Sequence, residues 1–381
     1  RSYAVYLLHW PLFVLYLTAT DQETFDLRTG AALIAIALVA ATIMTWGVDR
    51  PAQVFPRSGR RLRIQAAMVV TSLVVGGLPL GVAGGAIAYQ RQQEISQQVQ
   101  VGVDPDHPGA LALGKGQASE WTKPPVPGPL AVTAEWVSLS TTRCDEAVAA
   151  RVESENSSCR RLPSSSDDAV RAVVVGDSHA AQNAIPTLRL LHDTKDWDIT
   201  AYLKGACSFG LPEYYKGSCR DRNSAVLEQM EDDPPDVVVL QTTETSEDSS
   251  LELLRPGIKR LVERLTSEGI TVVGFRDNPR SEESLYECAS TVGPETMVGG
   301  CVFPKEDVMA AEDPAKFLEE IPLFHQIDAS DMLCPDDVCG TIIGDVFVYM
   351  DDNHVSATYS RTMAPELASR IEQAMGIEEP E

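Results

Sequence analysis

The chain has 381 residues, of which 44% are hydrophobic and 23% are charged, so it is long enough to form more than one folded domain. Its charge is uneven, because residues 1–100 carry 8 Lys/Arg against 5 Asp/Glu, whereas the rest carries 23 against 50. An acidic surface of this size repels phosphate backbones and anionic lipid headgroups. This argues against nucleic acid as a partner and favours a neutral or sugar-like substrate.

Three apolar runs precede the acidic part, at residues 3–20, 31–48 and 67–89. Each is close to the roughly 20 residues with which a helix spans a bilayer, so we expect transmembrane helices rather than buried helices of a soluble protein. The loop between the second and third runs holds five arginines from Arg50 to Arg63. The positive-inside rule places this loop in the cytoplasm. The third run then crosses outward, so we expect a multi-pass protein of the cell membrane with residues 90–381 on the extracytoplasmic side.

All eight cysteines lie in the acidic part and fall into four close pairs in sequence order. An even number of cysteines without a CxxC motif is typical of disulfides in an oxidising compartment and not of a zinc site. We therefore expect no metal and four disulfides that join sequence neighbours: Cys144 with Cys159, Cys207 with Cys219, Cys288 with Cys301, and Cys334 with Cys339.

Residues 90–140 are rich in Gln, Gly and Pro and predict a linker, which is followed by an extracytoplasmic domain over residues 141–381. In this domain short β-branched runs alternate with amphipathic stretches, which predicts an α/β fold: a three-layer, doubly wound, mostly parallel sheet with its active site at the carboxyl ends of the strands. The expected strands are 172–176, 198–203, 236–241, 270–275 and 345–350, and the expected helices are 180–193, 220–232, 252–268 and 357–375.

The first expected strand runs directly into Gly176, Asp177, Ser178 and His179, and a helical stretch follows at once. Gly176 permits a tight turn, and the N-terminus of the next helix offers unpaired N–H groups to an oxyanion. This placement suits a nucleophilic Ser178. Ser and Asp are also ordinary helix caps, so the tripeptide alone leaves both interpretations open.

The end of the chain supplies partners for such a nucleophile. Asp351 precedes His354 by three residues, between the last expected strand and the last expected helix. His354 could take the proton of Ser178 while Asp351 holds the imidazole tautomer, as in a serine triad. The sequence therefore predicts a catalytic triad of Ser178, His354 and Asp351.

These motifs make the resemblance specific. GDSH after the first strand, with DxxH near the C-terminus, resembles the SGNH hydrolase superfamily, whose sheet is flavodoxin-like. YAVYLLHWPLFV at 3–14, which contains His9 and Trp10, resembles the HWP motif of the acyltransferase type 3 membrane family, and GVDRPAQ at 47–53 resembles the end of its last core helix. His9 and Trp10 are interpreted either as part of the membrane site or as interfacial anchors.

The resemblance implies an organisation and a reaction. Residues 1–66 would hold the last two core helices and the Arg-rich loop, and residues 67–89 an added helix that carries the SGNH-like domain. The membrane part would take acetyl from cytoplasmic acetyl-CoA, and Ser178 would pass it to an extracytoplasmic glycan or glycolipid. No cofactor is expected to bind this chain itself, and the acyl supply would depend on early membrane helices that this chain lacks.

One departure from the superfamily concerns the oxyanion hole. No GxND motif follows the third expected strand, where the chain reads Gln241 and Thr242. We expect the N–H of Gly205, or the side chains of Gln241 or Thr242, to serve instead. His179 is interpreted as facing the sheet edge or solvent. Asp277 and Asn278 follow the fourth strand, either at the rim of the active site, where Arg276 could contact an acceptor sugar, or, as we favour, in a capped turn before Pro279.

Three functions remain open at this point. The first is an O-acyltransferase, with acetyl as the expected group. The second is an esterase that removes acetyl with the same triad, because water can replace the acceptor. The third is a catalytically inactive glycan-binding module on a membrane anchor.

Overall fold

The computed structural model describes the following residues: 9–10, 13, 16, 27–44, 89, 105–113, 123–128, 131–246, 249–282, 284–291 and 301–377. The chain divides into two compact units, Arg1–Ile87 and Ala88–Glu381. Each unit is considered by itself.

The described part of the first unit is chiefly one helix, α2 (Leu27–Met44), which covers most of the predicted run 31–48. His9 and Trp10 are helical; the His9 ring lies 5.7 Å from that of Phe13, and Trp10 is 67% exposed. None of the helices formed by the described residues is both long enough and apolar enough to cross a membrane. The runs 3–20 and 67–89 and the Arg-rich loop fall outside these residues except at single positions, so the spans stay a prediction.

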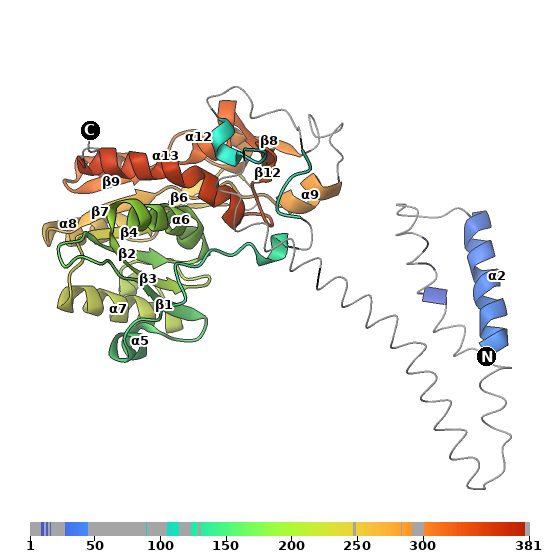
Figure 1. The fold of residues 1–381 in the computed structure, drawn as a ribbon, viewed down its shortest axis with the longest axis horizontal. Coiled ribbons are helices and arrows are strands. Elements are labelled where there is room, and N and C mark those ends of the chain that lie inside the picture. The colour runs from blue at the N-terminus through green and yellow to red at the C-terminus, as the bar shows by residue number, and fades with distance from the viewer. Residues whose placement is uncertain are drawn as a thin grey trace, which may run out of the picture. The chain divides into compact units, whose positions relative to one another are not determined.

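The second unit is built on a six-stranded sheet with the order β1-β3-β2-β4-β7-β9 (Figure 1). Five strands run parallel, and β1 at the edge is antiparallel to β3. This confirms a mostly parallel sheet in an α/β domain. The strands are β1 (Ser157–Leu162), β2 (Arg171–Gly176), β3 (Asp198–Lys204), β4 (Val237–Gln241), β7 (Thr271–Phe275) and β9 (Phe324–Ile327).

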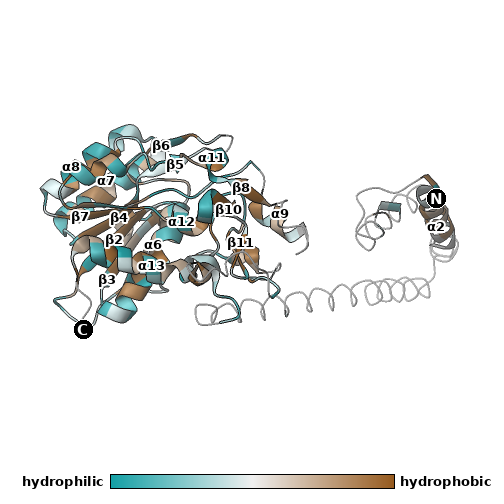
Figure 2. Cartoon of the chain, turned by 90° about the horizontal axis from the view of Figure 1, so that it is seen from above, coloured by the Kyte–Doolittle hydropathy of each residue, from teal (hydrophilic) through white to brown (hydrophobic). Residues whose placement is uncertain are grey.

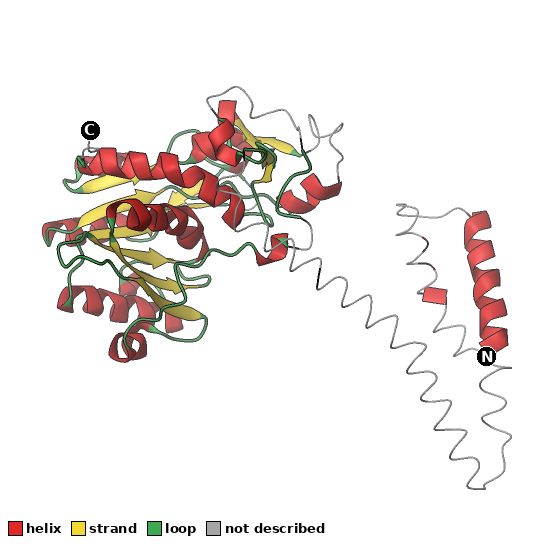
Figure 3. Cartoon of the chain, in the orientation of Figure 1, coloured by secondary structure: helices red, strands yellow, loops and turns green. Residues whose placement is uncertain are grey.

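Alternate residues of the central strands enter two separate cores, because successive side chains of a strand point to opposite faces. Val174 and Val239 belong to one core, and Val173 and Val238 to the other. Helices therefore cover both faces, as Figure 3 shows, and the central strands between them are largely hydrophobic (Figure 2). The first core is covered by α6 (Ser178–Lys195) and α13 (Ala357–Met375), and the second by α5 (Glu146–Val152), α7 (Gly217–Asp232) and α8 (Ile258–Ser267).

The run 345–350 was expected as the last strand of the central sheet, and this expectation was wrong. Only β12 (Val346–Phe347) forms there, and it pairs with β11 (Ile342–Ile343) in a separate hairpin. The edge position belongs to β9. His325 and Gln326 make this strand polar in its middle, so the sequence did not predict a strand there. Similarly, the expected helix 252–268 begins as β6 (Glu252–Leu254), which pairs with β5 (Thr243–Thr245).

Shorter elements complete the unit. They are η2 (Gly109–Ala112), η3 (Val132–Ala134), η4 (Pro212–Tyr214), α9 (Leu285–Thr291), β8 (Val302–Pro304), α11 (Lys305–Val308), η5 (Lys316–Glu320), α12 (Ser330–Leu333), η6 (Pro335–Asp337) and β10 (Val338–Gly340).

The predicted linker 90–140 contributes to the fold of the domain wherever it is described. The N–H of Gly109 donates to Gly344 O at 3.0 Å, and the N–H of Ala110 donates to Thr362 Oγ1 at 2.9 Å. Val126 exchanges backbone hydrogen bonds with Asp345 and Phe347. Because these contacts join residues more than 200 positions apart, composition alone could not reveal them.

The four disulfides join the pairs expected from the spacing: Cys144–Cys159, Cys207–Cys219, Cys288–Cys301 and Cys334–Cys339. The described part of the chain holds no free cysteine. Such density is typical of proteins in an oxidising compartment.

We predict that Gly109→Ala destabilises the domain more than Gly217→Ala. Both glycines have a φ in the left-handed region, at 53° and 55°. A Cβ at Gly109 would lie 2.8 Å from Thr362 Cγ2, whereas a Cβ at Gly217 would have nothing within 4 Å. The expected loss in the free energy of unfolding is about 1 kcal/mol for Gly217→Ala and about 2–4 kcal/mol for Gly109→Ala. Urea unfolding measures both, and equal losses would contradict the packing of this segment.

Candidate active site

The turn between β2 and α6 presents Ser178 at the carboxyl end of the sheet. Gly176 has a φ of 146°, and a Cβ there would lie 2.6 Å from Ala180 Cβ, so the position requires glycine. Asp177 caps α6, because its Oδ1 accepts from the N–H groups of His179 (3.1 Å) and Ala180 (3.3 Å). The helix thus begins at Ser178 itself.

Ser178, His354 and Asp351 lie in one hydrogen-bonded chain. Ser178 Oγ is 2.9 Å from His354 Nε2, and His354 Nδ1 is 2.7 Å from Asp351 Oδ2. The structure therefore brings together the three residues that the sequence singled out. This is the geometry in which an imidazole can accept a hydroxyl proton while a carboxylate holds its other nitrogen protonated.

The loop that carries Asp351 and His354 is ordered by its own carboxylate. Asp351 Oδ1 accepts from the N–H groups of Asn353 (3.0 Å) and His354 (2.7 Å), and Met350 N–H donates to His354 O. Burial raises the pKa of Asp351, but these hydrogen bonds and His354 lower it by more, so the net pKa shift is downward. The carboxylate is therefore ionised at neutral pH.

His179 is buried, which corrects its expected position at the sheet edge or in solvent. Its Nδ1 is 2.7 Å from Asp277 Oδ1 and its Nε2 is 2.8 Å from Asn353 Oδ1. Its ring centroid lies 4.9 Å from that of His354. His179 thereby connects the end of β7 to the loop of the triad.

These contacts favour the charged form of His179. Asn353 Nδ2 donates to Asp352 Oδ2 at 2.6 Å, so the amide oxygen faces His179. An imidazole with an acceptor at each nitrogen must carry two protons. Burial lowers the pKa of His179, but the charge of Asp277 and its hydrogen bond raise it by more, so the net pKa shift is upward. His179 and Asp277 form a buried ion pair.

Asp277 is more than the capped turn that the sequence suggested. Its Oδ2 accepts from the Thr245 N–H at 2.8 Å and from Thr245 Oγ1 at 3.1 Å, and its Oδ1 accepts from Gln241 Nε2. Burial raises the pKa of Asp277, yet His179 outweighs it and holds that pKa well below the usual range. The carboxylate is fully paired inside the domain.

The donors expected for the oxyanion hole are engaged elsewhere. The Gly205 N–H donates to Asn156 O at 3.1 Å, Gln241 Nε2 donates to Asp277, and Thr242 Oγ1 donates to Phe275 O at 3.0 Å. The Ser178 N–H, by contrast, is the first N–H of α6 and stands ahead of the His179 and Ala180 N–H groups that Asp177 caps. This first-turn N–H of α6 is therefore the better candidate donor.

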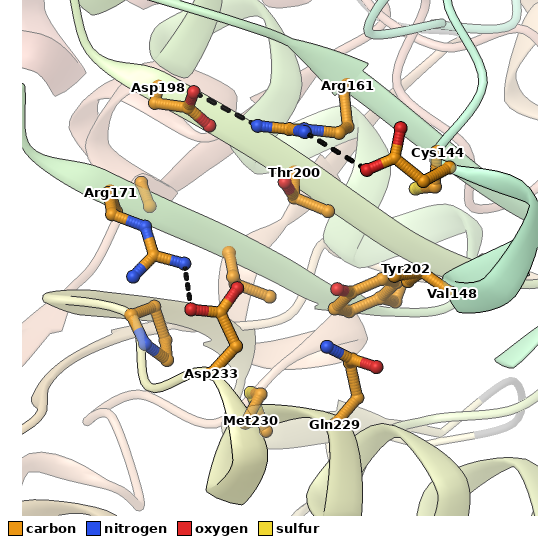
Figure 4. A pocket seen from close by; sticks show the side chains of 14 residues that line it. Cys144, Val148, Arg161, Arg171, Asp198, Thr200, Tyr202, Gln229, Met230 and Asp233 are labelled. Carbon is orange, nitrogen blue, oxygen red and sulfur yellow. Dashed lines mark hydrogen bonds and ion pairs between the residues drawn. The ribbon is translucent and has the colours of Figure 1, made fainter. Parts of the chain in front are cut away.

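A separate pocket lies away from the triad (Figure 4). Arg171 and Asp198, at the amino ends of β2 and β3, line it with Arg161, Tyr202 and Asp233. Its cavity volume is about 90 Å³. Its charges compensate one another, since Arg161 pairs with Asp198 at 3.3 Å and Arg171 with Asp233 at 2.7 Å. It offers no unpaired charge to a ligand, and it lies at the opposite end of the strands from Ser178.

Comparison with known families supplies the classification. Residues 143–369 match the SGNH domain that is fused to AT3 domains. The chain belongs to this family. The match covers Ser178, Asp351 and His354, together with His179 and Asp277, so the hydrogen-bonded network lies entirely inside the SGNH domain.

Two further comparisons add little to this assignment. Among solved structures, the chain is similar to the lipopolysaccharide acetyltransferase periplasmic domain of Salmonella ser. Paratyphi A, with 16% identity and a TM-score of 0.39. That similarity covers 54% of this chain and 85% of that chain. No curated protein matches the chain.

We predict that Asp277→Asn destabilises the SGNH domain by about 3–5 kcal/mol, because it leaves a buried cation without its partner. Asp232→Asn is the matched control, since the exposed pair of Arg151 and Asp232 should be worth less than about 1 kcal/mol. Urea unfolding at pH 6 measures both. Similar losses in the two variants would contradict the buried ion pair.

The pH dependence of stability gives a second readout in the same experiment. Folding raises the pKa of His179 above its reference value of 6.5, so its stabilisation is complete below 6.5 and is lost as pH rises through the folded-state value. The wild-type free energy of unfolding should therefore fall as the pH rises above 6.5, and more steeply than that of Asp277→Asn. Parallel curves would mean that His179 is not held as a cation.

Proposed function

We propose that this protein is an O-acyltransferase, with acetyl as the transferred group, that uses Ser178 to pass it to a hydroxyl of an extracytoplasmic glycan or glycolipid. The observation that carries the proposal is the chain of hydrogen bonds from Ser178 through His354 to Asp351 within an SGNH domain. The family's fusion to AT3 domains supports acyl transfer as the reaction class.

In the first step Ser178 becomes acylated. His354 Nε2 takes the hydroxyl proton as Oγ attacks the acyl carbonyl carbon, and Asp351 stabilises the imidazolium that forms. The N–H of Ser178, at the positive end of α6, donates to the developing oxyanion. The tetrahedral intermediate collapses, the bond to the leaving group breaks, and His354 returns the proton to that group.

In the second step an acceptor hydroxyl takes the place of the leaving group. His354 removes its proton, its oxygen attacks the acyl carbon, and the bond between Ser178 Oγ and that carbon breaks. The proton then goes from His354 to Ser178 Oγ, which restores the resting site. Because the two steps are chemically alike, one triad serves both.

The acyl group comes from the membrane side in this proposal. Acetyl-CoA is the cytoplasmic donor to the full-length protein, and early membrane helices outside this chain carry acetyl across the bilayer. The four disulfides support an oxidising compartment for the SGNH domain. The excess of acidic residues after residue 100 supports an uncharged acceptor in preference to an anionic one.

An esterase is the alternative that the geometry favours next. The side chains of His354 and Asp351 are 18% and 33% exposed, so water can approach the base as an acceptor would. A deacetylase would use the same two steps with water in the second. Ser178, His354 and Asp351 are joined by hydrogen bonds in the geometry of a working triad, which argues against an inactive binding module.

The experiment measures O-acetyl groups on envelope glycans and glycolipids by mass spectrometry. It compares cells that carry the full-length protein with cells that carry Ser178→Ala. We expect the loss of at least one acetylated species, because the acyl-enzyme cannot form. Ser166→Ala, a change in an exposed turn, is the matched control and should leave the acetylation pattern intact.

Each other outcome would contradict the proposal. A gain of acetylated species in Ser178→Ala would identify a deacetylase. An unchanged pattern would favour the binding module.

A further inference from the structure

Trp136 is an exposed aromatic side chain next to the proposed general base. Its ring centroid lies 4.9 Å from that of His354, with 65° between the ring planes. Its exposed fraction is 52%. Single exposed apolar residues are common on protein surfaces, so the position beside His354, and not the exposure, gives Trp136 its significance.

The backbone on both sides of Trp136 is fixed. Glu135 is 3% exposed and binds the first turn of α13, because its carbonyl oxygen accepts from Ala357 N–H at 3.1 Å and its Oε2 from Thr358 N–H at 2.6 Å. On the other side Leu139 is buried, and its carbonyl oxygen accepts from Arg189 Nη1 at 3.0 Å. These anchors on both sides hold Trp136 at the surface beside His354.

On the His354 side of Trp136, two carboxylates disfavour an anionic occupant. Asp351 lies behind His354, and Asp352 lies next to it in the loop. The occupant must also bring a hydroxyl to His354 Nε2. A pyranose ring meets both conditions, because it is uncharged, its C–H face can pack on an indole, and its hydroxyls project from the ring edge.

We propose that Trp136 is the platform on which a pyranose ring of the acyl acceptor packs, and that this contact favours transfer over hydrolysis. The inference rests on the proposed function and adds the substrate subsite. The sugar covers the approach to His354 and holds one hydroxyl near the acyl carbon of acyl-Ser178. Transfer is favoured over hydrolysis by proximity, because a bound hydroxyl competes with water at a raised effective concentration.

The second step then has a defined acceptor. The sugar hydroxyl gives its proton to His354 Nε2, and its oxygen forms a bond to the acyl carbon. The Ser178 Oγ to carbon bond breaks, and Oγ receives the proton from His354. Water attacks in the same way when the platform is empty, which yields free acid.

The test measures how the acyl-enzyme of the 381-residue chain divides between sugar and water. 4-Nitrophenyl acetate is the donor, methyl α-D-glucopyranoside, galactopyranoside and mannopyranoside are the acceptors, and glycerol is a hydroxyl acceptor without a ring face. The ratio of acetylated acceptor to free acetate is the readout. We expect Trp136→Ala to lower this ratio about tenfold for at least one pyranoside, and to lower it far less for glycerol.

Two further variants make the test specific. Trp136→Phe keeps an aromatic face and should retain at least about a third of the wild-type ratio. Phe317→Ala removes an aromatic side chain that is 47% exposed on η5, and it should keep the full ratio. Equal ratios in wild type and Trp136→Ala, or no preference of the wild type for pyranosides over glycerol, would overturn the platform.

Binding without catalysis separates this inference from the proposed function. Saturation-transfer NMR with the Ser178→Ala chain should detect contact with the same pyranosides, and adding Trp136→Ala should abolish it. Binding that depends on Trp136 without acetylation of Ser178 in the wild type would support the platform and overturn the transferase. Acetylation of Ser178 without binding that depends on Trp136 would overturn the platform and leave the proposed function standing.

Discussion

The buried ion pair of His179 and Asp277 is the interaction on which the rest of the site depends. It joins residues 98 positions apart, and His179 also contacts Asn353, which lies 174 positions after His179 in the chain. The β2–α6 turn, the end of β7 and the triad loop are thereby tied together. Burying two charges is costly unless each is fully hydrogen-bonded, so the fold must bring these segments into register for the pair to form. The same register aligns Ser178 with His354.

Much of this arrangement follows from local sequence. The apolar runs that became β2, β3, β4 and β7 predict a sheet buried on both faces, and Gly176 predicts the turn that exposes Ser178. Asp351 and His354 could be predicted from the sequence because only two residues separate them. Hydrogen bonds within the same loop then fix their geometry, so no distant contact is needed. Short-range patterns were sufficient for these features.

Features that depend on distant contacts could not be predicted in this way. The edge strand β9 has a mixed burial pattern, and the antiparallel pairing of β1 has no local signal. The partners of Gln241 and Thr242 became known only when the end of β7 was placed beside them. Trp136 lay in a segment that composition marked as a linker, and only the contact of Glu135 with the start of α13 shows why it lies at the site.

The most direct test of the account is covalent labelling of Ser178 with a serine-reactive organophosphate, followed by peptide mass spectrometry of the folded chain. The account predicts one adduct per chain, on Ser178, with labelling at least about a thousandfold slower in His354→Ala. Circular dichroism of the variant would establish that it is folded. Absence of the adduct in folded wild type, or equal labelling rates in the two proteins, would contradict the claim that His354 activates Ser178.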